Sequence, residues 1–396
     1  MRLYNIRLGD ICKVKGGFAF KSKDFIDNGV PVIKIANIYK NEVVVNQSTS
    51  YVDSGFLDKY KDFIVKEGSL LIALSGATTG KFGIYKSTDE ALLNQRVAMI
   101  VPDEDKTTTK FIYYCLQGLQ KQIFDKALGA AQPNISPKEI EEFSIMFGGM
   151  DYQNKVVKLL DTAQILIKKR KEQISALSSL RQSVFLDMFS NYDSMKKVKI
   201  SELIDSLEAG LSTGGESKEK QDGEYGVLTV GAVTKGVFNP KAYKVPTKEI
   251  KNPKRIIHPT KQSILFSRAN TRELVGASCI VERDYGDLFI PDKIWKIKLN
   301  LDCVNPYYFV TFIQQEFFRK KLSKEATGTS GSMLNISQQK FKNMEIYLPS
   351  ISQQNEFAEV LERISFSKSK LEKSLVELEN NFSSLMQQAF KGELFN

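Results

Sequence analysis

The feature that most constrains this chain is that it repeats itself once. Four pairs of segments match in the same order: Ile6–Ile11 with Val198–Leu203, Gly68–Ile72 with Gln262–Phe266, Asn134–Ser136 with Asn335–Ser337, and Gln153–Asn154 with Gln354–Asn355. The last two pairs share an offset of 201 residues, and the others lie close to it. Such order predicts a duplicated architecture, so the 396 residues divide into two units of about 200 rather than forming one large core.

Each half ends in a long segment with an apolar period of about 3.5 residues and no proline. This period predicts two long helices, at 149–190 and 350–396, with Asp151 and Ser352 as candidate N-caps. The residues predicted to pair the helices are Val156, Leu160, Ile167, Ile174 and Leu177 in the first, and Phe357, Leu361, Leu371, Leu375, Leu378 and Phe382 in the second. An antiparallel pair with pseudo-twofold symmetry would bury both seams. Packing of each helix on its own domain only, or on another subunit, remains open.

The rest of each half, 1–148 and 194–349, contains short apolar runs separated by turns that are rich in Gly, Asn and Asp. The predicted strands are Val30–Ile35, Val43–Val45, Val97–Val101, Gly226–Val230 and Ile294–Leu299. A helical stretch follows late in each half, near Lys110–Lys126 and Pro306–Lys321. The expected fold class is therefore α+β: two mixed α/β domains, each followed by one long helix.

The net charge and the cysteine content limit the candidate binding partners and the cellular compartment of this protein. Lys and Arg number 56 against 46 Asp and Glu, and the net charge of +10 makes a large polyanion the first partner to consider. The four cysteines lie far apart and there is one histidine, which argues against zinc fingers and a disulfide framework and favours a reducing compartment. The start of the chain does not resemble a signal peptide, and no apolar run is long enough to span a bilayer. We expect a cytoplasmic protein without a membrane partner.

Motifs for catalysis are incomplete. Gly76–Phe82 resembles a phosphate-binding P-loop, but it is one residue short and has Phe82 where a Mg²⁺-binding Ser or Thr belongs. Asn305–Tyr308 resembles an amino-group methyltransferase signature but has Tyr307 in place of a proline, so a helix start is the simpler interpretation. Pro291-Asp292 lacks the following Glu-x-Lys or Asp-x-Lys of a nuclease. We therefore expect no catalytic residues, no bound metal and a binding function.

DNA binding requires cations for phosphates, and amide, hydroxyl or guanidinium groups for base edges. The candidates follow predicted strands: Lys34, Asn37, Ser75, Thr78, Thr79, Lys81, Arg96, Gln132 and Asn134 in the first half, and Arg268, Asn270, Thr271, Arg272, Lys293, Ser330 and Ser332 in the second. Ser267–Arg272 is the strongest local signal, because two arginines and an asparagine in a short turn suit guanine and adenine. The basic clusters Lys168–Lys171 and Arg319–Lys321 are more simply solvated faces, although DNA or a subunit contact would also explain them.

The whole pattern resembles the specificity subunits of type I restriction-modification systems. Gly16–Ser22 and Gly29–Ile38 look like the opening of a target recognition domain of that family, and Asn335–Ser337 followed by Ile346–Gln354 looks like its junction into a spacer helix. The first junction departs from this pattern, with Phe147–Met150 in place of a proline-rich step.

The resemblance implies that each domain recognises one half of a split, asymmetric DNA site and that the helices set the spacer. The first seam, Val156–Val184, would span about 43 Å, which is on the order of one turn of DNA. It also implies docking of two methyltransferase subunits and of restriction subunits, which would carry S-adenosylmethionine, ATP and Mg²⁺. The alternatives are the recognition subunit of a combined restriction and methylation enzyme of type IIB or IIG kind, a self-contained DNA-modifying enzyme, and a coiled-coil scaffold.

Overall fold

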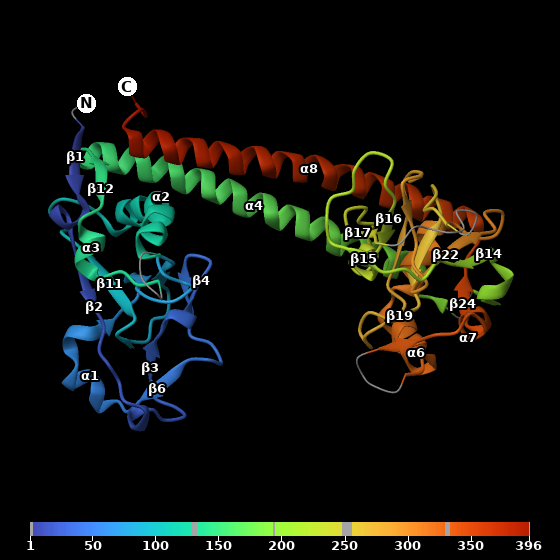
Figure 1. The fold of residues 1–396 in the computed structure, drawn as a ribbon, viewed down its shortest axis with the longest axis horizontal. Helices are drawn as coiled ribbons and strands as arrows, with labels where there is room; N and C mark the ends of the chain where they lie inside the picture. The colour runs from blue at the N-terminus through green and yellow to red at the C-terminus, as the bar shows by residue number, and fades with distance from the viewer. Residues whose placement is uncertain (1–2, 129–132, 193–194, 248–255, 329–332, 396) are drawn as a thin grey trace. The chain divides into compact units, whose positions relative to one another are not determined.

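The computed structural model describes residues 3–128, 133–192, 195–247, 256–328 and 333–395. Two compact units divide the chain: unit 1 comprises Met1–Lys171 with Lys373–Asn396, and unit 2 comprises Glu172–Glu372. Each unit holds one mixed α/β domain and parts of both long helices, α4 (Met150–Phe189) and α8 (Ile351–Lys391) (Figure 1). Helices and strands are mixed within each domain, as the α+β prediction requires.

The described residues of unit 1 form three sheets. In spatial order, the six-stranded sheet is β2 (Cys12–Gly16), β11 (Val97–Pro102), β8 (Leu70–Ala73), β9 (Phe82–Tyr85), β5 (Glu42–Val43) and β4 (Ile38–Tyr39). The four-stranded sheet is β6 (Ser50–Val52), β3 (Val30–Ile33), β10 (Ala91–Leu93) and β7 (Ile64–Val65), and β1 (Tyr4–Arg7) pairs with β12 (Ser144–Phe147). The shorter helices are α1 (Gly55–Lys59), α2 (Thr109–Ala127) and α3 (Pro137–Glu141).

Unit 2 follows a related plan with shorter sheets. In spatial order, one sheet is β14 (Ile204–Ala209), β22 (Ile294–Leu299), β18 (Ile264–Ser267) and β20 (Ser278–Ile280), and another is β15 (Gly215–Glu216), β17 (Tyr243–Pro246), β16 (Gly226–Leu228) and β21 (Leu288–Phe289). The two-stranded pairs are β13 (Lys196–Lys199) with β24 (Glu345–Leu348), and β19 (Ala269–Asn270) with β23 (Leu334–Asn335). The shorter helices are α5 (Pro306–Ile313), α6 (Glu316–Glu325) and α7 (Gln338–Asn343).

The central strand of each domain is buried on both faces. In β8, Leu70 and Ile72 join the core cluster that includes α2, whereas Leu71 and Ala73 join a second cluster on the opposite face. In β18, Ile264 and Phe266 face one cluster and Leu265 the other. Successive side chains of a strand point to opposite faces, so burial of both faces explains why these strands are continuous apolar runs.

The two long helices pair within each unit. In unit 1, the Tyr152 hydroxyl donates to the Ala389 carbonyl at 2.6 Å, and Lys171 Nζ lies 2.8 Å from a Glu379 carboxylate oxygen. Moving forward along α4 thus means moving backward along α8, which makes the pair antiparallel as predicted. In unit 2, the rings of Phe185 and Phe357 lie 5.6 Å apart.

None of the predicted pairing residues of the two helices is exposed. Val156, Leu160, Phe357 and Leu361 are buried, and the other predicted pairing residues are half-buried: Ile167, Ile174, Leu177, Leu371, Leu375, Leu378 and Phe382. The fold therefore contains the duplicated domains and the antiparallel helix pair that the repeat predicts.

Three local expectations need correction. Asp151 is not the N-cap of the first long helix, because α4 begins at Met150 and the Gln153 N–H donates to the Gly149 carbonyl at 3.2 Å. The stretch Pro306–Lys321 is not one helix, because α5 ends at Ile313 and α6 begins at Glu316, with the Gln314 side chain donating to the Ser278 carbonyl at the break. Ser352 does not cap the last helix. Ser350 takes that role, since its side chain and that of Gln353 hydrogen-bond each other's backbone N–H groups.

Among the described residues, no helix combines the length and apolar character needed to cross a membrane.

Candidate nucleic-acid interface

The same backbone junction occurs at the end of the central strand in both domains. After β8, the Leu74 N–H donates to the Arg96 carbonyl, and the Leu74 carbonyl accepts from the Ile135 N–H, both at 2.9 Å. After β18, Arg268 makes the corresponding bonds to Lys293 and Ile336, both at 3.0 Å. Three loops therefore meet around Leu74 in the first domain and around Arg268 in the second.

A glycine approaches each junction too closely for any other residue. A Cβ on Gly17 would lie 2.3 Å from the Asn94 carbonyl oxygen, and one on Gly210 would lie 2.0 Å from that of Ile290. The residue after each glycine continues the correspondence, because the Phe18 N–H donates to Leu93 and the Leu211 N–H donates to Ile290.

These bonds align the two domains residue by residue at the junction. Leu93 corresponds to Ile290, so Gln95 corresponds to Asp292 and Arg96 to Lys293. Both domains thus carry an exposed cation at one position, Arg96 or Lys293, and different groups at two others.

In the first domain, the junction gathers several predicted residues. Ser75 pairs with Asn134 in an isolated β-bridge, while Lys81 and Asn134 are exposed. The hydroxyl oxygens of Ser75 and Thr78 are buried and have no hydrogen-bond partner among the residues that the structure describes. Unpaired buried hydroxyls are uncommon, and both of these lie on the loop between β8 and β9.

Asn37 and Thr79 have a different role from the one predicted. The Asn37 side chain is 1% exposed and hydrogen-bonds the Lys34 N–H, the Val44 carbonyl and the Thr49 hydroxyl. Thr79 is 3% exposed and donates to the Gly76 carbonyl. Because their polar groups are already used inside the domain, these residues shape loops and do not face a ligand.

Lys34 is also engaged within its domain. Its Nζ donates to the Ser50 hydroxyl at 2.7 Å and lies 4.0 Å from the centre of the Phe25 ring. Partial burial lowers the pKa of this amine.

In the second domain, Arg268 is held by contacts with Asp292. Its Nε donates to the Asp292 carbonyl at 2.6 Å, its Nη2 lies 3.6 Å from the Asp292 carboxylate, and its side chain is 30% exposed. Asn270 closes the turn, because its side chain bonds the Thr271 N–H and the Ser267 hydroxyl. Arg272 and Lys293 are exposed on either side of this turn.

The interpretation of Arg319 as part of a solvated face is wrong, because this residue is half-buried and bound within the domain, and Ser323 was not among the predicted residues. Arg319 on α6 donates to the Glu273 carbonyl at 2.8 Å, and the Ser323 hydroxyl donates to the Arg272 carbonyl, so α6 holds the loop that carries Arg272. Burial lowers the pKa of the Arg319 guanidinium. Asp292 lies beside Arg268 only in the tertiary structure, since the two residues are 24 positions apart in the chain.

Three predicted residues, Gln132, Ser330 and Ser332, lie outside the described residues.

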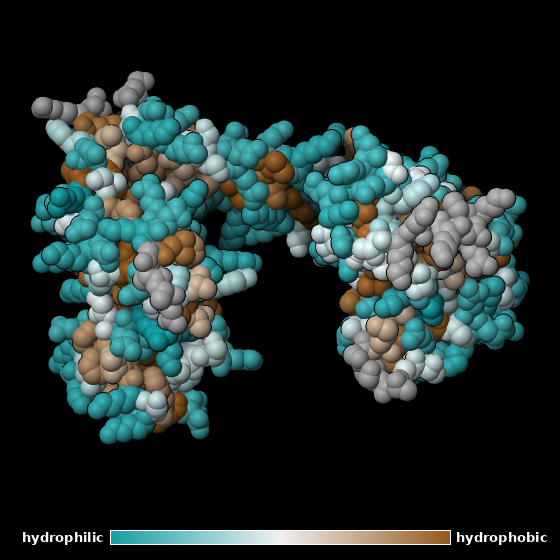
Figure 2. All heavy atoms as spheres, viewed as in Figure 1, coloured by the Kyte–Doolittle hydropathy of each residue, from teal (hydrophilic) through white to brown (hydrophobic). Residues whose placement is uncertain are grey.

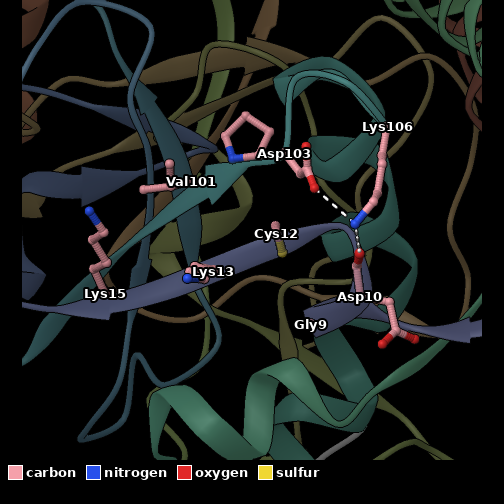
Figure 3. Close-up of a pocket in the computed structure, with 9 residues that line it drawn as sticks. Gly9, Asp10, Cys12, Lys13, Lys15, Val101, Asp103 and Lys106 are labelled. Carbon is pink, nitrogen blue, oxygen red and sulfur yellow. Dashed lines mark hydrogen bonds and ion pairs between the residues drawn. The ribbon is translucent and has the colours of Figure 1, made fainter.

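One hollow in unit 1 is lined by a cysteine and several lysines. Figure 3 shows this hollow, lined by Cys12, Lys13 and Lys15, in which Lys106 reaches the Asp103 carboxylate at 2.9 Å and the Asp10 carbonyl at 3.1 Å. Burial raises the pKa of the Cys12 thiol to about 12, so it is not a thiolate nucleophile. Over the described ranges, no cluster of His, Cys, Asp or Glu side chains has the arrangement of a metal site.

The fold and the junctions together define a class of protein: two copies of one α+β domain that present different polar groups from the same backbone frame. Residues 4–176 and 192–380 match the family model described as the type I restriction modification DNA specificity domain. The chain therefore belongs to this family.

Specificity subunits of known type I restriction enzymes are similar in sequence. The MjaVIII subunit of Methanocaldococcus jannaschii is 28% identical over 43% of this chain, and the match spans 42% of that relative. The EcoBI subunit of Escherichia coli is 24% identical over 98% of this chain and 85% of its own length.

Solved structures share the fold. The type I restriction-modification S subunit from M. genitalium aligns with a TM-score of 0.54 and 13% identity, over 98% of this chain and 96% of that one. A chain from a study of assembly and conformational transition of a type I system aligns with a TM-score of 0.61 and 13% identity, over 99% and 98%.

Proposed function

We propose that this chain selects the DNA sequence for a type I restriction-modification complex, with each domain recognising one half of a bipartite asymmetric site. The observation that carries the proposal is the repeated junction, in which an identical backbone frame presents different side chains. Two such frames suit two half-sites of different sequence. The two long helices would then set the spacer between the half-sites.

In this proposal, cationic side chains provide affinity for DNA, and polar side chains on the loops of each junction provide sequence specificity. Net charge of +10, together with the exposed cations Arg96 and Lys293 at equivalent positions, favours phosphate contacts that are independent of sequence. Base contacts would come from groups that differ between the domains: Ser75, Thr78 and Asn134 in the first, and Arg268 and Arg272 in the second.

Methylation and cleavage would be supplied by partner subunits in the cytoplasm, and this chain would be non-catalytic. Two methyltransferase copies and restriction subunits would bind S-adenosylmethionine, ATP and Mg²⁺. Figure 2 shows apolar surface along the long helices among hydrophilic neighbours. Exposed apolar residues of these helices include Ile165, Leu166 and Val376 in unit 1, and Leu180, Leu186 and Phe366 in unit 2. Exposed apolar groups on an otherwise polar helix pair support docking of a partner on each unit.

A direct test is selection of randomised DNA duplexes by the purified full chain, followed by sequencing of the bound fraction. The expected result is a split motif: two short specific segments of different sequence separated by a fixed non-specific spacer. A continuous motif, or no enrichment over random DNA, would overturn the proposal. Methylation or cleavage of DNA by the purified chain alone would overturn the non-catalytic part.

A further inference from the structure

The Arg268 guanidinium is fixed on one side and open on the other. Its Nε donates a hydrogen bond to the Asp292 carbonyl at 2.6 Å, and its Nη2 lies 3.6 Å from the Asp292 carboxylate. Neither Nη1 nor Nη2 donates a hydrogen bond to a residue within the described ranges, so the fork of the guanidinium is free to bind another group. The backbone of Arg268 is held as well, since it lies at the centre of the junction described above.

An arginine held in this way suits guanine. Nη1 and Nη2 form a planar fork that matches the O6 and N7 acceptors of guanine in the major groove. Fixing the guanidinium in advance reduces the side-chain entropy lost on binding. A carboxylate is unfavourable beside DNA phosphates, so the simplest role for Asp292 at an otherwise basic turn is to orient Arg268.

The first domain lacks this device at the corresponding position. Leu74 replaces Arg268 and is 6% exposed, and Gln95 replaces Asp292. The corresponding position therefore offers no guanidinium in the first domain.

Resting on the proposed function, we infer that Arg268, oriented by Asp292, reads a guanine in the half-site bound by the second domain. Asp292 is a positioning residue, and the equivalent position of the first domain makes no such contact. The chemistry recognised is one G·C base pair through its major-groove edge.

The main test is the double variant Arg268→Leu with Asp292→Gln in the full chain, assayed by selection from randomised duplexes. This variant copies the side chains that the first domain carries at the same positions, so its fold has a precedent within the molecule. We expect loss of preference for G at one position of one half-site, by about 5- to 150-fold, with the other half-site unchanged. Unchanged preference at every position would overturn the inference.

Two further variants separate reading from structural support. Asp292→Asn keeps the backbone acceptor and should cause a smaller loss at the same base pair. Arg283→Ala is the matched control, because Arg283 is exposed in the same domain and lies over the Tyr285 ring, 4.8 Å from its centre. If Arg268 were only structural, its replacement would weaken all positions of the half-site equally, and that result would overturn the inference.

The wild-type motif distinguishes the two proposals. Absence of a split motif would overturn the proposed function itself. A split motif in which neither half contains a required guanine would leave the proposed function standing and overturn only the role of Arg268.

Discussion

The two recognition domains share a backbone frame and differ in charge. Residues 1–148 contain 19 Lys and Arg against 17 Asp and Glu, whereas residues 194–349 contain 25 against 17. Most of the net positive charge therefore belongs to the second domain. Long-range attraction to DNA scales with charge, whereas the junction hydrogen bonds are backbone bonds that do not depend on the side chains they carry. The comparison teaches that backbone hydrogen bonds set the geometry of each junction, whereas the side chains on it set what the domain recognises.

The strongest way to break the comparison is to block the close backbone approach at one junction. Gly210→Ala would place a Cβ 2.0 Å from the Ile290 carbonyl oxygen, so the free energy of unfolding should fall by roughly 3 kcal/mol. Gly214→Ala is the matched control, since no atom lies within 4 Å of the added Cβ. Denaturant titration measures both, and equal stabilities would refute the shared frame.

A second test concerns a buried glutamine that both units use in the same way. Gln153 bonds the Thr107 hydroxyl and two backbone carbonyls, and Gln354 bonds the Asn305 N–H and two carbonyls. Replacing either with Leu leaves buried polar groups unpaired, which should cost about 2 kcal/mol or more.

Gln387→Leu is the matched control for the two buried glutamines, because Gln387 is exposed. This variant should change the free energy of unfolding by less than about 0.5 kcal/mol. Thermal or denaturant unfolding measures all three. A large effect for Gln153 and none for Gln354 would show that the units are not equivalent here.

The third test asks whether the two units dock partners equivalently. Ile165 and Phe366 are 201 residues apart, like the repeat itself, and both are exposed on the long helices. Ile165→Asp or Phe366→Asp should each weaken binding of one of two methyltransferase copies by about 10- to 100-fold. Mass measurement of the assembled complex would show one copy lost. Phe366→Leu should retain both, and two copies on both Asp variants would place docking elsewhere.

The smallest expected effect is at the equivalent cations. Arg96→Ala and Lys293→Ala should each lower affinity for all DNA sequences by less than about tenfold and reduce the slope of log affinity against log salt by about one. Binding titrations at several salt concentrations measure this slope. A change in sequence preference for either variant would mean that these cations read bases rather than phosphates.

Much of the fold was predictable because it depends on local periodicity. The 3.5-residue apolar period predicts both long helices, whereas the central strands β8 and β18 are not among the strands predicted from the sequence. The division of Pro306–Lys321 into α5 and α6 was not predictable, because it depends on a Gln314 side chain that bonds a distant strand. The sequence predicts Ser352 as the N-cap, whereas the structure has Ser350 in that role because Ser350 and Gln353 form a reciprocal pair of hydrogen bonds.

The candidate site was predictable in its residue types and less so in their roles. Arg268 and Asn270 stood out as a short polar turn, and the structure places them at the junction. Asn37 and Thr79 are polar loop residues of the same kind in the sequence, but their side chains hydrogen-bond to groups inside the domain. Residue type cannot distinguish a polar group that faces solvent from one that satisfies a buried backbone group.

The sequence by itself determined that this protein is a duplication, that each copy ends in a long helix, and that a polyanion is a suitable partner, because repeats, periods and net charge are properties of the chain. Only the tertiary structure decided that Leu74 and Arg268 occupy the same position, and that Asp292 holds Arg268. These facts depend on hydrogen bonds between segments far apart in sequence, which no local pattern records. The sequence contains the residues that differ between the two domains, but only the folded backbone shows which of them occupy equivalent positions.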